Sequence, residues 1–535
     1  MDQPPHAPGP PARITNIGRL LSGSARNFPD RIAVRDRGST CTYRALNERV
    51  NALAASLQGI ATTDDARVLI WLRNCPAYLE VLFACWKSGL VVVPVNARLR
   101  GHEVRHLAED SGATILFYGP EFTAEAAGID VPYRIVVGGE RAAGSTDLLY
   151  SQLLEREQPE QARELDEDHP AWLFYTSGTT GRPKGAILTH RNLLHVVLGW
   201  CADLYPLEPE DVVLHCAPLS HGAGFLGLAA IARGAENVVH EKWDPARFCA
   251  DVERFGVTAT WLVPTQIRAL LDYQGLEARS IASLACIVYG GSPMHREDLV
   301  EALRRIGPIF CQIFGQGESP MTITYLRRSE HELDGGPADR LLSAGRPRTG
   351  IDVRIVGEDG QPLPDGEVGE IVVRGPTVMS GYWGNPDATQ AAIRNGWLHT
   401  GDLGRMDECG YLYVLDRKKD FIISGGANVY AREVEDVLLE HPSVHEAAVF
   451  GVPHRVWGEA VTAAVVATVT PDELLAFVEP RLADYKRPKQ IFLCDELPKN
   501  AYGKVLKRDL RATFSESPDP VDAQVGTNGR TGGNE

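Results

Sequence analysis

The chain has 535 residues, which is too long for one ordinary domain, so we expect at least two domains and a substantial buried core in the larger one. The formal net charge of −16 is spread along the sequence, which argues against nucleic acid or an anionic membrane as the main partner. Ten cysteines are scattered singly, without a C-x-x-C pair or a zinc-like spacing to histidine, so we expect reduced thiols in a cytoplasmic protein.

Both terminal segments differ in composition from the rest of the chain. Residues 1–14 are proline-rich and lack the apolar core of a secretory signal, and residues 515–535 contain hardly any apolar side chains. Neither segment can offset its ordering entropy by burial, so both are predicted to be disordered. The longest apolar stretch, near residues 89–95, is far shorter than the roughly 20 residues that a membrane-spanning helix needs, so no integral membrane association is expected.

Between about residues 31 and 314, short apolar runs alternate with helical stretches, which is typical of parallel sheets covered by helices. The runs are nearly continuous, as expected for strands buried on both faces. They cover residues 67–72, 113–118, 171–175, 212–219, 258–264, 285–291 and 309–315. Leu46, Val50, Leu53 and Leu57 fall on one helical stripe, as do the apolar residues of 299–306. This part is predicted to be doubly wound α/β.

Beyond Gly345 the pattern changes to alternating strands, separated by turn signals at Asp359-Gly360 and Asp365-Gly366. We expect a small, antiparallel, barrel-like part here. A charged segment then precedes a second β–α alternation, which predicts a separate small α+β domain. The expected boundaries are 15–415 for a large N-terminal domain, 416–419 for a hinge and 420–514 for a mobile C-terminal domain.

The most informative stretch is YTSGTTGRPKG, residues 175–185, a glycine- and hydroxyl-rich loop after a buried strand. Its glycines let backbone amides approach an anion, and its hydroxyls and Lys184 add donors and a charge. It is not a Walker loop, because Pro183 precedes the lysine and Gly185 follows it. Taken alone, the composition also fits a surface loop between a strand and a helix.

Together with later motifs, this loop resembles the adenylate-forming (AMP-binding) superfamily, which includes acyl-CoA synthetases, adenylation domains and luciferases. The resemblance covers roughly residues 15–514. The matching motifs are YTSGTTGRPKG (175–185), APLSHGAGF (217–225), YGGSPM (289–294), FGQGES (314–319), WLHTGD (397–402), DRKKDFIISGGAN (416–428) and PKNAYGK (498–504). It implies that ATP and Mg²⁺ convert a carboxylic acid into an acyl-adenylate with release of pyrophosphate, and that coenzyme A then takes the acyl group as AMP leaves.

The resemblance implies roles for individual residues at the nucleotide site. Lys504 is expected to contact the reacting carboxylate and the α-phosphate, Lys184 the pyrophosphate, and Glu318 the Mg²⁺ ion. Asp402 is the expected ligand of the ribose hydroxyls, because a carboxylate can accept two hydrogen bonds. The other residues implied in ATP and AMP binding are Thr176, Ser177, Gly178, Thr179, Thr180, Gly181, Gly290, Gly291, Ser292, Pro293, Phe314, Gly315, Gln316 and Arg417.

It also implies an acyl pocket, a CoA site and a pivot. The expected acyl-pocket residues are His221, Phe225, Trp261, Tyr289, Gly317 and Met321. They are mostly apolar or small, which favours an aromatic or a medium- to long-chain acid over acetate. The expected CoA-binding residues are Ser424, Gly425, Gly426, Trp457, Tyr485 and Arg487. Lys419 is the expected pivot of the hinge.

Two residues depart from the family pattern, and several have a simpler interpretation. Gly317 stands where the family usually has threonine, and Ala431 replaces a common proline. His221 could be an ordinary buried histidine, and Trp457 could merely pack the small domain. Lys486 and Lys499 are interpreted as solvated charges, and the cysteines at 216, 286 and 311 as core residues.

Three hypotheses for function stay open. Coenzyme A is favoured as the acceptor because no carrier domain is expected after residue 515, and because no aspartate between Pro218 and Asp244 could pair with the ammonium of an amino acid. The runner-up is a stand-alone adenylating enzyme that passes the acyl group to a carrier protein or an amine. The third is a nucleotide-binding protein without catalysis. The sequence leaves the oligomeric state open, a homodimer included.

Overall fold

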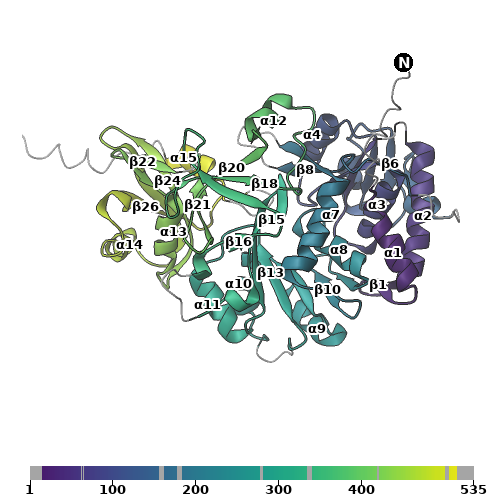
Figure 1. Cartoon of the computed structure of the whole chain (residues 1–535), viewed down its shortest axis with the longest axis horizontal. Coiled ribbons are helices and arrows are strands. Elements are labelled where there is room, and N and C mark those ends of the chain that lie inside the picture. The colour runs from purple at the N-terminus through teal and green to yellow at the C-terminus, as the bar shows by residue number, and fades with distance from the viewer. Residues whose placement is uncertain are drawn as a thin grey trace, which may run out of the picture. The chain divides into compact units, whose positions relative to one another are not determined.

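The computed structural model describes residues 15–61, 63, 65–155, 162–176, 183–276, 281–333, 340–418, 421–499 and 505–514. The chain divides into two compact units. Unit 1 comprises residues 1–400 and 404–414, and unit 2 comprises residues 401–403 and 415–535. The predicted class is confirmed: a large α/β part that contains several sheets is followed by a smaller α+β part (Figure 1).

A seven-stranded sheet forms the first half of unit 1, in the order β7-β6-β5-β3-β4-β8-β9. Its strands are β3 (Arg67–Trp71), β4 (Val91–Pro94), β5 (Ile115–Tyr118), β6 (Tyr133–Val136), β7 (Leu148–Leu149), β8 (Pro170–Thr176) and β9 (Lys184–Thr189). All neighbours are parallel except β8 and β9, which form an antiparallel pair at one edge. This hairpin carries both ends of the predicted phosphate loop.

A nine-stranded sheet has the order β16-β15-β14-β13-β12-β10-β11-β1-β2. Its strands are β1 (Ile32–Arg35), β2 (Thr40–Thr42), β10 (Val212–His215), β11 (Glu236–Val239), β12 (Ala259–Leu262), β13 (Cys286–Gly290), β14 (Phe310–Gln316), β15 (Ser319–Leu326) and β16 (Arg346–Pro347). The central neighbours are parallel and the edge pairs are antiparallel. The predicted buried strands of this region are confirmed.

One apolar run is longer than the strand it forms. Residues 212–219 form a strand only as far as His215, and the carbonyls of Cys216 and Ala217 then accept hydrogen bonds from side chains instead. The side chain of Asn74 holds the segment that follows: its amide donates to the carbonyl of Ala217 at 2.8 Å and its carbonyl accepts from the N–H of Leu219 at 2.8 Å. This segment thereby turns away from the sheet towards His221.

The helices of unit 1 cover the sheets (Figure 1). They are α1 (Arg19–Asn27), α2 (Tyr43–Ile60), α3 (Pro76–Ser88), α4 (Gly101–Ser111), α5 (Thr123–Ala126), α6 (Tyr150–Leu153), α7 (His190–Gly199), α8 (Gly222–Arg233), α9 (Pro245–Phe255), α10 (Pro264–Asp272), α11 (Arg296–Arg305) and α12 (Pro386–Ala392). The hydroxyl of Thr42 caps α2, and the predicted stripe of Leu46, Val50, Leu53 and Leu57 is buried. None of the described helices is long and apolar enough to cross a bilayer.

The region after Gly345 forms a five-stranded sheet. Its strands are β17 (Asp352–Val356), β18 (Gly369–Arg374), β19 (Ile393–Arg394), β20 (Trp397–Met406) and β21 (Leu412–Arg417). The pairs β17/β18 and β19/β20 are antiparallel. The predicted turns lie between β17 and β18, where Gly360 and Gly366 have φ of 76° and 84°, a region that glycine enters without steric cost.

Unit 2 contains a second five-stranded sheet. Its strands are β22 (Ile422–Ser424), β23 (Ala427–Val429), β24 (Val444–His454), β25 (Gly458–Ala467) and β26 (Gln490–Leu493), with helices α13 (Ala431–Leu439), α14 (Pro471–Val478) and α15 (Lys507–Phe514). Val434, Leu438 and Leu474 lie in one buried cluster, together with Val461 of β25. A smaller cluster contains Phe450 and Leu510 of α15. Unit 2 therefore has its own apolar core.

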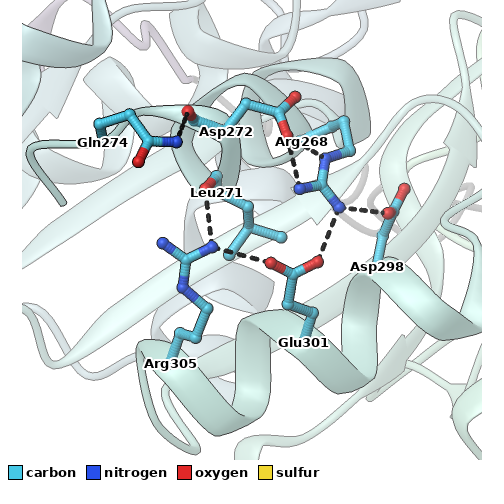
Figure 2. A network of polar contacts seen from close by, with 7 residues as sticks. All are labelled: Arg268, Leu271, Asp272, Gln274, Asp298, Glu301 and Arg305. Atoms are coloured by element: carbon cyan, nitrogen blue, oxygen red, sulfur yellow. Dashed lines mark hydrogen bonds and ion pairs between the residues drawn. The ribbon is translucent and has the colours of Figure 1, made fainter. Parts of the chain in front are cut away.

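An ion network ties α10 to α11 on the surface of unit 1 (Figure 2). The guanidinium of Arg268 binds Asp272 at 2.7 Å and both Asp298 and Glu301 at 2.8 Å. Glu301 also binds Arg305 at 2.8 Å. These helices follow β12 and precede β14, so the network fixes two helices that flank the strands of the candidate site.

The substitution Arg268→Met should destabilise the protein modestly, because it leaves three carboxylates without their shared cation. The side chains are partly exposed, so we expect a loss of about 1 kcal/mol at low salt, and less in 1 M NaCl. The hydrogen bond from Arg268 lowers the pKa of Glu301, so its contribution is present above the ordinary carboxyl pKa and is lost as the pH falls through the folded value. Urea unfolding at pH 7 and pH 4 measures this.

The matched control is Arg44→Met, because Arg44 pairs with a single exposed carboxylate, Asp30. We expect a smaller loss for this variant. A loss in Arg268→Met that is the same at both pH values and at both salt concentrations would contradict the electrostatic explanation.

Candidate active site

The tip of the β14–β15 hairpin is the centre of the candidate site. Gln316 pairs with Ser319, so the tip consists of only two residues, Gly317 and Glu318. The side-chain amide of Gln316 donates to the carbonyl of Thr400 at 3.0 Å, which anchors the end of β14. The carbonyl of Glu318 accepts from the N–H of Met379 at 2.8 Å. The hairpin tip is therefore held by its neighbours.

Met321 is in an unusual backbone conformation just beyond this tip. Its φ of 58° lies in the left-handed region, which costs free energy for a residue with a side chain. The buried side chain of Arg348 donates to the carbonyl of Met321 at 3.0 Å and pairs with buried Asp203 at 3.2 Å. Backbone strain of this kind is concentrated at functional sites, and here a buried ion pair supports it.

Two hydroxyl groups hold the carboxylate of Glu318. The hydroxyl of Thr176, at the end of β8, donates to Oε1 at 2.9 Å, and the phenol of Tyr382 donates to the same oxygen at 2.8 Å. Because β8 and β14 belong to different sheets, this carboxylate joins the two halves of unit 1. Within the described part of the chain, Oε2 of Glu318 forms no hydrogen bond or ion pair.

Lys184 contacts the ring of the same tyrosine, Tyr382. Its ammonium is 5.4 Å from the centre of the tyrosine ring. Residues 380–383 run beside β9, where the N–H of Ile187 donates to the carbonyl of Gly381 at 2.9 Å and the N–H of Trp383 donates to that of Gly185 at 2.8 Å. Tyr382 was not predicted as a site residue. Its only sequence signal is the aromatic pair Tyr382-Trp383, which directly follows Gly381 in a turn-rich stretch.

The predicted adenine-binding residues lie at the carboxyl ends of neighbouring parallel strands. Gly290 ends β13 and pairs with Ile313 of β14. A Cβ atom at Gly290 would lie 2.3 Å from the carbonyl oxygen of Ile313, so the close approach of the two strands requires glycine. Gly291, Ser292 and Pro293 follow and are exposed. On the neighbouring strand, Phe314 and Gly315 lie near the end of β14. Ligands of open α/β sheets bind at such carboxyl edges.

The two residues predicted near the ribose lie together in unit 2. The guanidinium Nε of Arg417 is 2.8 Å from Oδ1 of Asp402. Asp402 is buried, whereas the side chain of Arg417 is 41% exposed, so the pair is open to solvent from the arginine side. The other predicted residues of the loop, hinge and catalytic motif lie outside the described residues. They are Ser177, Gly178, Thr179, Thr180, Gly181, Lys419 and Lys504.

Two of the predicted acyl-pocket residues contact a further aromatic residue, Phe174, and a third lies beside the residue that follows His221. The rings of Phe174 and His221 meet edge to face at 5.5 Å, and Phe174 stacks on Phe225 at 6.0 Å. Trp261 lies beside Gly222, where a Cβ atom would come within 2.9 Å of the indole. Burial lowers the pKa of His221 to about 4, so its imidazole is neutral at neutral pH. The group therefore offers an apolar, uncharged surface.

Gly317 packs against the same Phe174. A Cβ atom at this position would lie 2.3 Å from the methyl group of Thr176 and 2.6 Å from the ring of Phe174. The place of the threonine side chain usual in this family is thus filled by Phe174 and Thr176. Gly317 and Phe174 are one packing unit, which explains the departure from the family pattern.

Tyr289 packs in a different apolar cluster from the other predicted acyl-pocket residues. Its side chain is buried in one cluster of unit 1, where it packs edge to face on Phe310 at 6.1 Å. Its hydroxyl lies 3.0 Å from Nε2 of His331. Phe225, Trp261 and Met321 are buried in another cluster. A role for Tyr289 in the acyl pocket stays a prediction.

The predicted CoA-binding residues lie in two groups in unit 2. Gly425 donates its N–H to the carbonyl of Trp457 at 2.8 Å, and Ser424 pairs with Gly458. The indole of Trp457 is half-buried and stacks on His454 at 4.2 Å. Tyr485, in the turn 484–486, is 43% exposed. Arg487 follows it and pairs with Glu479 at 3.4 Å.

The simpler interpretations meet different outcomes. Lys486 and Lys499, which were interpreted as solvated charges, form ion pairs with Glu433 and Glu446 at 2.6 and 2.7 Å. The cysteines at 216, 286 and 311 are buried. The N–H of Ala431, which a proline would lack, donates to the carboxylate of Asp416 at 2.7 Å and so begins α13.

The residues around Glu318 fit a Mg²⁺ ion that binds together with a nucleotide. Mg²⁺ is usually held by one or two carboxylates plus phosphate oxygens and water. Among the described residues, no group of three or more histidine, cysteine, aspartate or glutamate side chains could hold a metal by itself. Glu318 would therefore be a single protein ligand, and phosphate and water would supply the others.

The fold and the site define a nucleotide-binding α/β enzyme. The family model of the AMP-binding enzymes matches residues 21–383, and that of their C-terminal domain matches residues 433–504. The chain belongs to the AMP-binding enzyme family. The predicted resemblance is thereby confirmed.

Relatives of known activity are similar over nearly the whole chain. A feruloyl-CoA synthase of an Amycolatopsis species is 39% identical over 94% of this chain and all of its own length. A medium/long-chain-fatty-acid–CoA ligase of Mycobacterium tuberculosis is 41% identical over 94% of this chain and 90% of its own. The structure of o-succinylbenzoate-CoA synthetase from Bacillus subtilis with its acyl-adenylate intermediate is 33% identical, with a TM-score of 0.82 over 92% of this chain and 98% of its own.

These comparisons bear out the predicted enzyme class. The protein is an acyl-CoA synthetase of the AMP-forming type, which works through an acyl-adenylate. The predictions of ATP, Mg²⁺ and coenzyme A are confirmed with it, and the same Bacillus subtilis synthetase has been solved with ATP and a magnesium ion. The hypothesis of a nucleotide-binding protein without catalysis is set aside.

The substitution Gly317→Ala should destabilise the protein, because its Cβ atom has no room between Thr176 and Phe174. Overpacking of this kind costs about 1–3 kcal/mol. The midpoint of urea unfolding measures the loss, and the double variant with Phe174→Ala should regain part of it.

The matched control is Gly59→Ala in α2, where an added Cβ atom meets nothing within 4 Å. This variant should be neutral or more stable by up to about 1 kcal/mol, because alanine favours a helix over glycine. Equal stability of the Gly317→Ala variant and the wild type would contradict the packing argument.

Proposed function

We propose that this synthetase activates an aromatic or a medium- to long-chain carboxylic acid at the β14–β15 hairpin tip. One observation carries the proposal: Phe174 and Gly317 pack together, so the apolar group of Phe174, His221 and Phe225 lies directly beside the carboxylate of Glu318. The acyl chain of a substrate would contact the apolar group, and its carboxylate would face the charged residues.

The first half-reaction must bring together two anions, the substrate carboxylate and the α-phosphate of ATP. We assign Lys184 to the departing pyrophosphate and Lys504 to the two reacting groups. Glu318 would hold Mg²⁺, which neutralises phosphate charge when bound. Positive groups aimed at developing negative charge in a water-poor site stabilise the transition state, so no protein nucleophile is needed.

The nucleotide would lie along the carboxyl ends of β13 and β14. Phe314, Gly315 and Gln316 would face the adenine and its phosphates, with Gly290 to Pro293 on the neighbouring strand end. Asp402 would accept hydrogen bonds from the ribose hydroxyls, and its partner Arg417 holds that carboxylate in place. Of the phosphate loop, Thr176 and Lys184 would act together with residues 177–181.

In the second half-reaction coenzyme A must reach the acyl-adenylate. We propose that residues 420–514 form a mobile domain, which pivots in the segment 416–419 at Lys419 and so withdraws Lys504. The loop of Ser424, Gly425 and Gly426 beside Trp457 would then border the pantetheine arm. Tyr485 and Arg487 would contact the nucleotide of coenzyme A, since a guanidinium suits a phosphate.

The substrate class follows from the side chains around Phe174. They are apolar or neutral, and a charged acyl tail would lose its hydration there without gaining a partner. Gly317 and Gly222 keep the surface free of further side chains. The feruloyl-CoA synthase and the fatty-acid ligase among the relatives act on an aromatic and an aliphatic acid, and both kinds of acid suit such a surface.

We also infer a cytoplasmic location, because none of the ten cysteines is in a disulfide. Nucleic acid is not expected as a partner of a chain with a net charge of −16. A homodimer stays a prediction.

The test is pyrophosphate release by the purified protein with ATP and Mg²⁺, over a panel of aryl and alkyl acids, with and without coenzyme A. We expect turnover that needs both an acid and coenzyme A, and aryl or medium- to long-chain acids should be preferred to acetate. Lys504→Ala should lower the rate of adenylation on the order of a thousandfold, because one such donor contributes about 3–4 kcal/mol.

Lys499→Ala is the matched control for this variant. It removes a lysine from the same motif, but one that pairs with Glu446 at the surface, so its rate should stay near that of the wild type. Stoichiometric pyrophosphate release that ignores coenzyme A would instead favour transfer to a carrier protein or an amine. A preference for acetate would overturn the proposed substrate class.

A further inference from the structure

Tyr382 contacts both of the charged groups on which the proposed chemistry depends. Its phenol donates to Oε1 of Glu318 at 2.8 Å, and the ammonium of Lys184 is 5.4 Å from its ring centre. Within the described residues, Lys184 and Glu318 form no ion pair with each other. The tyrosine therefore contacts a cation through its ring and an anion through its hydroxyl, and these two charged groups would attract one another if they met.

The hydrogen bonds to Glu318 decide which of its oxygens can bind a metal. Thr176 and Tyr382 both donate to Oε1, so the carboxylate cannot rotate without losing two bonds. Oε2 is then left to face a cation. Residues that hold a ligating carboxylate typically contribute a factor of about 10–100 to metal affinity.

The position of Tyr382 is itself fixed by the backbone. It forms a bridge with Ala186 of β9, and the neighbouring bonds Ile187 to Gly381 and Trp383 to Gly185 flank this bridge. Its N–H donates to the hydroxyl of Thr389 at 2.9 Å.

We propose that Tyr382 is a positioning residue for the magnesium-binding carboxylate: its hydroxyl orients Glu318, and its ring keeps Lys184 from pairing with that carboxylate. This inference rests on the proposed function, in which Glu318 holds Mg²⁺. It adds a residue that touches neither substrate nor metal but sets the affinity for the metal. It also assigns a separate purpose to the hydroxyl and to the ring.

The test measures metal binding directly. Mn²⁺ replaces Mg²⁺, and electron paramagnetic resonance counts the free ion in the presence of the full-length enzyme and a non-hydrolysable ATP analogue. We expect Tyr382→Phe, which keeps the ring, to weaken Mn²⁺ binding about tenfold. The Mg²⁺ concentration for half-maximal pyrophosphate release should rise by a similar factor, while the rate at saturating Mg²⁺ changes less than about threefold.

Two further variants separate the two purposes. Thr176→Val removes the other donor to Oε1, so it should weaken Mn²⁺ binding to a similar extent. Tyr382→Leu removes hydroxyl and ring together, so Lys184 becomes free to pair with Glu318 and the loss should exceed that in Tyr382→Phe. Equal losses in the Leu and Phe variants would overturn the assigned purpose of the ring.

Tyr118→Phe is the matched control. It also deletes a phenol that donates to a carboxylate, that of Asp147 at 2.6 Å, but in the seven-stranded sheet between β5 and the residue before β7. Its Mn²⁺ affinity should equal that of the wild type. Unchanged affinity in Tyr382→Phe, or an equal loss in Tyr118→Phe, would overturn the inference, whereas a wild-type enzyme that binds no Mn²⁺ with the analogue would overturn the proposed metal site itself.

Discussion

The arrangement of the site depends on the carboxylate of Glu318, which joins the two large sheets of unit 1. It accepts hydrogen bonds from Thr176 at the end of β8 and from Tyr382 beside β9, while its own backbone belongs to the β14–β15 hairpin. Both donors lie on the side of the seven-stranded sheet, and both bind the same oxygen of a carboxylate carried by the nine-stranded sheet. Hydrogen bonds of this kind orient a metal-ligating carboxylate. Through this group, the end of β8 that precedes the predicted phosphate loop meets the β14–β15 hairpin of the other sheet.

The same hairpin tip shows how packing and chemistry share a small space. Gly317 has no side chain because the ring of Phe174 and the methyl group of Thr176 occupy its place. Phe174 in turn contacts His221 and Phe225. This aromatic group therefore extends to the hairpin tip that carries Glu318, and no threonine hydroxyl at position 317 separates them. The strained backbone of Met321, supported by buried Arg348 and Asp203, belongs to the same hairpin. The glycine at position 317, which departs from the family pattern, is therefore matched by the side chains of Phe174 and Thr176 that fill its place.

Part of the candidate site could be predicted from the sequence, because glycine-rich turns, hydroxyl-rich loops and charged residues occur at characteristic positions in the motifs. The glycines at 290 and 291, the hydroxyl-rich loop and the pair Asp402 and Arg417 occur at set positions in the chain, and the structure brings the described ones to strand ends or into contact. Side-chain direction is harder to predict, because a one-residue step along a strand reverses the face. Tyr289, which was predicted for the acyl pocket, contacts Phe310 and His331 in a cluster apart from the other predicted pocket residues. Phe174 and Tyr382 were missed, since their contacts are far apart in sequence.

The sequence by itself determined the α/β class, because buried apolar runs and turn residues are local properties of the chain. Its ordered motifs determined the enzyme family, and with it the chemistry of adenylation. Only the tertiary structure decided that Thr176 and Tyr382 hold Glu318, that Phe174 fills the place beside Gly317 and that Tyr382 contacts both Lys184 and Glu318. The hydrogen bonds to Glu318 span 142 residues from Thr176 and 64 residues from Tyr382. Packing in three dimensions, not the order of residues, brings these segments together.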